Sequence, residues 1–272
     1  MNYTQSQVEK FLKILKIQQR DPNLDSLTQI TNAYLTKIPF ENISKIYYMK
    51  KYGLMNMPDF DLYLKGISLY NFGGTCYSNN FYMNELLDYL GYDVRLCGAD
   101  MTNPDVHIVN VVNIDNRDYL VDVGYAAPFF DPIPLDLNRE YKIAFGADEY
   151  VLLPRNSNGY SELKMLRNGS IKHGYRVKPQ ARSISEFEMV IKDSFRESAT
   201  FLNAILLVRF GWQSSIRIHN FSLTESHLQR FKQIKIKNKK DLINNIFKYF
   251  AIPKEIIAES IGLITNYEDA WN

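Results

Sequence analysis

Cys76, which follows the pair Gly73-Gly74, is the residue of this sequence best suited to act as a nucleophile. After it, apolar residues recur at the spacing of one helix face: Met83, Leu86, Leu87 and Leu90. Gly91 then gives a helix stop signal, so Cys76 is expected at or just before a helix N-terminus. The amide groups and dipole there favour the thiolate, the reactive form of cysteine. The alternative is that Cys76 is a small buried apolar residue, as most free cysteines are.

Two residues further along the chain complete a possible catalytic set. His107 begins a β-branched run typical of a strand, and Asp122 lies inside the next such run. Aspartate is depleted in strands and is costly to bury alone, so Asp122 is expected to orient an imidazole. A nucleophile, a base and an orienting carboxylate indicate thiol acyl transfer. The other histidines are expected to be solvated or satisfied by local hydrogen bonds: His173, His219 and His227.

The pairing of the two strands is open. A hairpin that turns at Asn116-Arg117 sets Asp122 opposite Val111, on the same face as His107. The two side chains are then roughly 13 Å apart along the strands. A direct hydrogen bond between His107 and Asp122 therefore needs a bulge, strong coiling or a different register.

Composition restricts the class of protein. The chain has 272 residues, 46% of them hydrophobic, enough for a substantial core. Its 32 Lys and Arg nearly balance 30 Asp and Glu, which argues against a dedicated nucleic-acid binder. Two cysteines, Cys76 and Cys97, are too few for a disulfide framework and favour a reducing compartment. Residues 1–20 resemble no targeting peptide and no apolar run is long enough to span a membrane, so a cytoplasmic location without membrane partners is expected.

Helical periodicity comes first, strand periodicity second and a mixture last, which predicts an α+β protein. Capping signatures predict that helices begin near Ser6 and Ser26, the first over residues 7–17. The short strands that follow are typical of a barrel or a curled antiparallel sheet. We expect three closely packed regions: residues 1–90 helical with Cys76, residues 91–194 β-rich with His107 and Asp122, and residues 195–272 mixed.

Three further segments have open interpretations. Glu41 lies among apolar neighbours, and an exposed turn carboxylate is slightly favoured over a structural one that orders a nearby loop. Residues 186–192 are compatible with a short helix or a strand. The basic residues of the segment 230–240 could contact phosphates of coenzyme A. A solvated strand edge is the favoured interpretation, because lysines commonly protect sheet edges.

A series of motifs resembles the arylamine N-acetyltransferase family. They are Ile38–Ile43 (IPFENI), Gly73–Cys76 (GGTC), Val106–Val109 (VHIV), Tyr119–Tyr125 (YLVDVGY) and Pro132–Leu135 (PIPL). Their order and spacing are similar to those of the family, and they cover residues 38–135. A weaker likeness continues through residues 201–203 and 220–224, and the chain length also fits.

The resemblance implies an N-terminal helical bundle, a central antiparallel β-barrel and a C-terminal α/β lid, with a papain- or transglutaminase-like cysteine core. It implies a ping-pong reaction in which Cys76 takes an acetyl group from acetyl-CoA as a thioester. An aromatic amine, hydrazine or N-hydroxyarylamine then takes the acetyl group. His107 would be the base, Asp122 would orient it, and Phe40 and Tyr125 would line the acceptor pocket. No metal or bound prosthetic group is implied, and a monomer or homodimer is expected.

The sequence departs from the family pattern at three positions. Phe72 stands where the family usually has Arg, Ser78 where it has Glu, and Tyr34 where it has His. Because both halves of an apparent ion pair change together, a repacked neutral contact is expected. Two alternatives remain open: a cysteine protease or transglutaminase that uses the same three residues, and a catalytically silent binding protein that keeps the fold.

Overall fold

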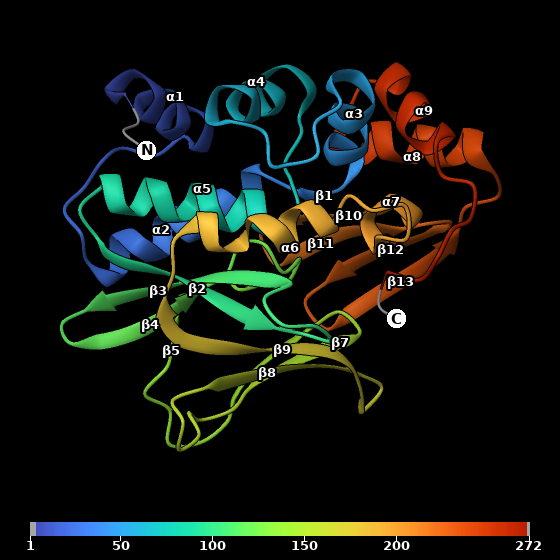
Figure 1. The fold of residues 1–272 in the computed structure, drawn as a ribbon. Coiled ribbons are helices and arrows are strands. Elements are labelled where there is room, and N and C mark those ends of the chain that lie inside the picture. Colours follow the sequence, from blue (N-terminus) through green and yellow to red (C-terminus); the bar gives the residue numbers. More distant parts are fainter. Residues whose placement is uncertain (1–3, 271–272) are drawn as a thin grey trace.

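The computed structural model describes residues 4–270, and Figure 1 shows their arrangement. Most of the helices form a layer along one side of the molecule, and two antiparallel sheets lie beneath them. The N-terminal part of the chain contains five helices: α1 (Gln5–Leu15), α2 (Leu24–Lys37), α3 (Ile43–Tyr52), α4 (Phe60–Tyr70) and α5 (Cys76–Tyr89). This organisation matches the predicted N-terminal helical region.

The first two helices begin earlier than the sequence patterns predicted. Thr4 caps α1 and receives the N–H of Gln7, whose side chain returns the bond. Asn23 caps α2 in the same way through Ser26, which the sequence analysis took for the cap itself. The predicted caps Ser6 and Ser26 were therefore wrong. In each helix the residue three positions after the true cap, Gln7 or Ser26, completes the capping box by bonding back to the N–H of the cap residue.

The larger sheet has eight antiparallel strands in the order β5-β4-β3-β2-β9-β8-β7-β6. Their bounds are β2 (Asp93–Asp100), β3 (His107–Ile114), β4 (Arg117–Val121), β5 (Ile133–Pro134), β6 (Tyr141–Phe145), β7 (Asp148–Leu152), β8 (Ser161–Arg167) and β9 (Ser170–Ala181). The sheet curls but stays open, with β5 and β6 at its edges, so it forms a half-barrel. This is the curled antiparallel sheet that the strand pattern allowed, rather than the closed barrel that the family resemblance implied. Its inner face packs aliphatic and aromatic side chains such as Val109, Leu120 and Tyr150.

The β3–β4 hairpin has a different register from the one predicted. Ile114 pairs with Arg117, so the two-residue turn is Asp115-Asn116, and both turn residues have positive φ. This geometry is that of a tight type I′ hairpin, which Asn and Asp tolerate. The pairing moves every β4 residue two positions along β3 from the prediction and brings Asp122 nearer to His107.

The smaller sheet pairs one short strand from the N-terminal part of the chain with four strands from the C-terminal part. Its strands are β1 (Phe40–Glu41), β10 (Leu206–Gly211), β11 (Ser214–His219), β12 (Ser222–His227) and β13 (Arg230–Lys235), in that order across the sheet. Two C-terminal helices, α8 (Lys239–Phe250) and α9 (Lys254–Gly262), share a hydrophobic core with this sheet and with α3. The basic residues of β13 lie on an exposed edge strand, which confirms the favoured interpretation of that segment.

The chain between β9 and β10 is mostly helical. It contains the 3-10 turn η1 (Ile184–Phe187), α6 (Glu188–Asp193) and α7 (Thr200–Asn203), which settles the ambiguity at residues 186–192 in favour of helix. In Figure 1 these short helices lie between the helical layer and the sheets. Within residues 4–270, no helix combines the length and the apolar character needed to cross a membrane.

Candidate active site

Cys76 is the first residue of α5, as its sequence context predicted. Thr75 occupies the cap position in an extended conformation, and Cys76 is 8% exposed. At the other end of α5, Gly91 follows the cap residue Leu90 with a φ of +87°, which a residue with a side chain adopts at a cost. The sulfur atom therefore lies where the free N–H groups of a helix start favour negative charge.

The loop before Cys76 is held by Glu41, which is fully buried. One carboxylate oxygen of Glu41 accepts the N–H of Gly73 (3.0 Å) and the other accepts the N–H of Ser44 (2.9 Å). The main chain adds a bond from the Glu41 N–H to the Gly74 carbonyl (3.1 Å). The favoured interpretation of Glu41 as an exposed turn residue was wrong, because the distant Gly73 packs its N–H against this carboxylate and buries it.

Two glycines allow the close approach of backbone around the cysteine. A Cβ atom on Gly73 would lie 1.8 Å from the carbonyl oxygen of Pro39, and one on Gly124 would lie 2.8 Å from the Cα of Cys76. Neither contact can be relieved by rotating a side chain, since backbone atoms are involved. Glycine at these positions thus lets β1 and the chain after β4 press against the start of α5.

We predict that Glu41→Gln lowers the free energy of unfolding by about 1–3 kcal/mol. A glutamine side chain has one acceptor oxygen, so only one of the N–H groups of Gly73 and Ser44 keeps its partner and the other meets an NH2 group. Urea denaturation measures the loss. The matched control is Glu259→Gln on the exposed side of α9, and equal stability of the two variants would contradict the structural role of Glu41.

His107 and Asp122 are in direct contact. The Nε2 atom of His107 lies 2.8 Å from Oδ2 of Asp122, and both side chains are buried. The other carboxylate oxygen accepts the side-chain N–H of Asn80 (2.8 Å) and the N–H of Gly124 (2.9 Å). Asp122 lies one residue past the end of β4, where the chain leaves the strand and can turn toward His107.

Electrostatics favour a protonated His107 paired with an ionised Asp122. Burial alone would lower the pKa of His107, but the charge of Asp122 and the hydrogen bond to it raise this pKa overall, with a further contribution from Cys76. Burial opposes ionisation of Asp122, yet His107 and Asn80 hold the pKa of this carboxyl below its ordinary value. An imidazolium held beside a sulfur atom stabilises the thiolate form.

Asn80 is a structural member of the site that the sequence analysis missed. Its side chain donates to Asp122 and to the Ile108 carbonyl (2.6 Å), and its Oδ1 accepts the N–H of Val123 (2.9 Å). It therefore ties α5 to β3, which carries His107, and to the chain just after β4, which carries Asp122. The sequence offers one signal, because Asn80 lies one helical turn after Cys76 on the predicted helix.

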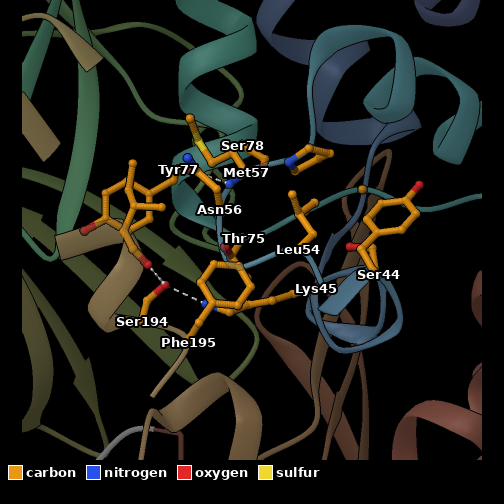
Figure 2. Close-up of a pocket in the computed structure, with 15 residues that line it drawn as sticks. Ser44, Lys45, Leu54, Asn56, Met57, Thr75, Tyr77, Ser78, Ser194 and Phe195 are labelled. Atoms are coloured by element: carbon orange, nitrogen blue, oxygen red, sulfur yellow. Dashed lines mark hydrogen bonds between the residues drawn. The ribbon is translucent and has the colours of Figure 1, made fainter. Parts of the chain in front are cut away.

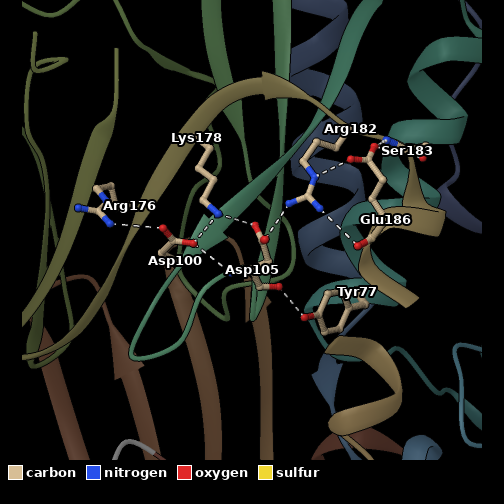
Figure 3. A network of polar contacts seen from close by, with 8 residues as sticks. All are labelled: Tyr77, Asp100, Asp105, Arg176, Lys178, Arg182, Ser183 and Glu186. Carbon is tan, nitrogen blue, oxygen red and sulfur yellow. Dashed lines mark hydrogen bonds and ion pairs between the residues drawn. The ribbon is translucent and has the colours of Figure 1, made fainter. Parts of the chain in front are cut away.

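The loop before His107 is held by a network of charged side chains (Figure 3). Asp105, in a left-handed conformation, pairs with Lys178 (2.9 Å) and Arg182 (2.7 Å) from the end of β9 and the residue after it. The hydroxyl of Tyr77 donates to the Asp105 carbonyl (2.8 Å), which connects the loop to α5. The network fixes Val106, whose carbonyl oxygen lies 3.9 Å from the sulfur of Cys76.

A cleft of about 1120 Å³ opens beside the cysteine. Cys76 and His107 reach it, and so do both residues expected to bind substrate, Phe40 and Tyr125. His173 also lines the cleft and hydrogen-bonds the hydroxyl of Tyr125, 48 residues away in the chain. The expectation that His173 is solvated or satisfied by local hydrogen bonds was therefore wrong. Burial lowers the pKa of His173 to about 4, so this ring is neutral at neutral pH and unsuited to carry charge.

The three departures from the family pattern have neutral surroundings. Phe72 is buried and packs edge-on against Tyr47 and Tyr48. The Tyr34 hydroxyl bonds to that of Tyr63 (2.6 Å) and donates to the Asn79 carbonyl (3.0 Å). Ser78 is buried next to Gly74. Aromatic packing and hydroxyl contacts thus occupy these positions. Within residues 4–270, no group of three or more His, Cys, Asp or Glu side chains is arranged to hold a metal ion.

A family model described as N-acetyltransferase matches residues 23–257 of the chain. Proansamycin X synthase of Amycolatopsis mediterranei is 27% identical over 185 residues, which cover 64% of this chain and 67% of that protein. The N-malonyltransferase FDB2 of Fusarium pseudograminearum is 28% identical over 45% of this chain and 44% of its own length. A pineal gland arylamine N-acetyltransferase of Gallus gallus, isozyme NAT-10, is 29% identical over 42% of this chain and 41% of its own. The last two alignments span less than half of those relatives.

Solved structures match over nearly the whole chain. The arylamine N-acetyltransferase of Salmonella typhimurium superposes with a TM-score of 0.78 at 17% identity, covering 96% of this chain and 99% of the other. The Mycobacterium marinum arylamine N-acetyltransferase in complex with CoA gives a TM-score of 0.75 at 18% identity, with 94% and 99% covered. These likenesses establish the fold, with its helical N-terminal region and curled sheet.

Proposed function

The chain belongs to the arylamine N-acetyltransferase family, and on that premise we propose that it is an acetyl-CoA-dependent acetyltransferase. We propose that the acetyl group passes through a thioester on Cys76 to an aromatic amine, hydrazine or N-hydroxyarylamine. The observation that carries the proposal is the contact of His107 with Asp122 at 2.8 Å, beside a cysteine at a helix start. The acetyltransferase family and the fold follow from the comparisons above.

In the first half-reaction the Cys76 thiolate attacks the thioester carbonyl of acetyl-CoA. The bond from the carbonyl carbon to the CoA sulfur breaks, the bond to Cys76 forms, and the departing CoA thiolate takes the proton that His107 holds. Because Nε2 of His107 bonds to Asp122, Nδ1 is the nitrogen left to exchange protons with sulfur. Backbone N–H groups near Cys76 are proposed to stabilise the tetrahedral oxyanion.

In the second half-reaction the amine nitrogen attacks the acetyl group on Cys76. The carbon–nitrogen bond forms, the Cys76 thiolate leaves, and His107 takes the proton from nitrogen, which restores the starting ion pair. Phe40 and Tyr125 are proposed to line the acceptor pocket, since both border the cleft. The core is then papain- or transglutaminase-like in its use of Cys, His and Asp, and the C-terminal region of β10–β13, α8 and α9 acts as the lid.

CoA is proposed as the leaving product, as in the complex named for the Mycobacterium marinum protein. Steady-state kinetics with acetyl-CoA and a panel of arylamines and hydrazines test the function. Parallel double-reciprocal lines that require Cys76 support a double displacement. Peptide cleavage without acetyl transfer would support the protease alternative, and a Cys76 no more reactive to iodoacetamide than Cys97 would support the silent one. Either result contradicts the proposal.

A further inference from the structure

Lys45 is a cation near the proposed nucleophile that the reaction above does not use. It lies in the first turn of α3, and it lines both the large cleft and a small adjoining cavity of about 30 Å³. Thr75, the residue before Cys76, lines both spaces as well. Figure 2 shows the Lys45 side chain next to the Phe195 ring and directed toward Ser194.

Among residues 4–270, the ammonium group of Lys45 has neutral partners. It donates a hydrogen bond to Ser194 Oγ (2.7 Å), and the centre of the Phe195 ring lies 4.0 Å from Nζ. Within the described part of the chain, no carboxylate forms an ion pair with Lys45, and Asp193 pairs with Arg196 (2.7 Å). An ammonium has three donors, so this one retains the capacity to bind an anion.

The energetics of this site favour an anionic ligand. Burial lowers the pKa of Lys45 to about 8, and the charge of Cys76 offsets part of the shift. A cation–π contact with Phe195 compensates only partly for lost hydration of the ammonium. A carboxylate brought into the cleft would give Lys45 a charged hydrogen-bond partner, and such bonds are stronger than those to a neutral hydroxyl.

We propose that Lys45 binds the free carboxylate of an acyl group carried on Cys76, so that the protein accepts donors of the malonyl-CoA type. The inference rests on the proposed function, because it requires an acyl group on the Cys76 sulfur. Lys45 and Cys76 line the same cleft, so an anion attached to the Cys76 sulfur enters the space that the Lys45 side chain borders. The bond exchange is unchanged: the acyl carbon leaves the CoA sulfur for Cys76, and the carboxylate stays intact.

Acyl-enzyme formation with three donors tests this. The probes are acetyl-CoA, propionyl-CoA as a neutral donor of larger size, and malonyl-CoA, with the product on Cys76 followed by mass spectrometry. We expect a malonyl group on Cys76 of the unaltered protein. Lys45→Met is expected to lower the malonyl-to-propionyl rate ratio roughly tenfold or more, and Lys45→Arg to lower it much less. The control Lys172→Met removes a charge from the exposed rim of the cleft and should change the ratio less than about twofold.

Alkylation gives a second measurement that needs no CoA. Iodoacetate places a carboxylate on the Cys76 sulfur, and iodoacetamide places a neutral amide of the same shape there. The iodoacetate-to-iodoacetamide rate ratio at Cys76 is expected to fall in Lys45→Met by roughly three- to tenfold. His107 attracts iodoacetate as well, but it is present in both proteins and cancels from the comparison.

The outcomes separate this inference from the function on which it rests. An acetyl group without a malonyl group on Cys76 would overturn the role of Lys45 and leave the acetyl transfer standing. Equal slowing of malonyl, propionyl and alkylation reactions in a folded Lys45→Met would also overturn it, because Lys45 would then act on the sulfur alone. Failure of every donor to acylate Cys76 would refute the proposed function itself.

Discussion

Acetylation of Cys76 is expected to slow by roughly a thousandfold or more when His107 is replaced by Gln. A glutamine side chain can hydrogen-bond Asp122 but cannot take the thiol proton or carry a positive charge beside the sulfur. The reacting thiolate would then have only the helix start to stabilise it, which is a weaker effect. Single-turnover acylation with acetyl-CoA, measured on the intact protein, gives the rate directly.

Two internal comparisons make this result specific. His227→Gln, at the exposed last residue of β12, is the matched control and should leave the rate unchanged. Cys97 is fully buried and its pKa is raised to about 11, chiefly by burial, so it should stay unmodified in every variant. A His107→Gln protein that acetylates Cys76 at nearly the normal rate would show that His107 is not the base.

Asp122→Asn is expected to lower the same rate by roughly 10²–10³-fold while the fold is kept. The NH2 group of Asn would face Nε2 of His107 and force it to act as an acceptor. The ring proton would then sit on Nδ1, the nitrogen that must receive the proton from sulfur. Asn80 and the N–H of Gly124 would still find an acceptor oxygen, so the site should remain assembled.

This variant should also change the pH dependence of Cys76 alkylation by iodoacetamide. The charge of Asp122 raises the pKa of His107, so the imidazolium persists as pH rises through neutrality until it reaches that raised pKa. Without that charge, burial lowers the pKa of His107, and the imidazolium is lost at lower pH. We therefore expect a nearly level alkylation rate across neutral pH in the unaltered protein and a rate that climbs with pH in Asp122→Asn. Two parallel profiles would contradict the coupling.

The parts of the fold that sequence reasoning predicted are those specified by neighbouring residues. The start of α5 follows from the glycines before Cys76 and the helical spacing after it, and its end follows from Gly91. The order of helices, strands and mixed elements was likewise visible in the changing periodicity.

The parts that were missed depend on contacts between distant segments. Nothing near Glu41 in sequence shows that Gly73 will bring a buried N–H to its carboxylate. The hairpin register was misplaced because Asp115-Asn116 carries no glycine, although both residues adopt the left-handed conformation that a tight turn requires. The observed register shortens the separation of His107 and Asp122 along the strands, so the two side chains meet without a bulge between β3 and β4.

Some residues of the site were recognisable from their local sequence, and others only from the fold. Cys76, His107 and Asp122 were found because their residue types are unusual in their local settings and form one chemical set. Asn80 and Lys45 were not found, since a buried asparagine and a lysine on a helix are common, and only the fold shows what they face. The motif resemblance located Phe40 and Tyr125 at the cleft, but their part in binding an acceptor is still a prediction.

Incubation with acetyl-CoA and no amine is the most direct measurement of the central claim. Intact-mass and peptide-level mass spectrometry should find a single acetyl group, bound as a thioester to Cys76, that disappears when an arylamine is added. Cys76→Ala should acquire none. An acetylated amine formed while Cys76 never carries the acetyl group, or a Cys76→Ala protein that still transfers it, would contradict the account.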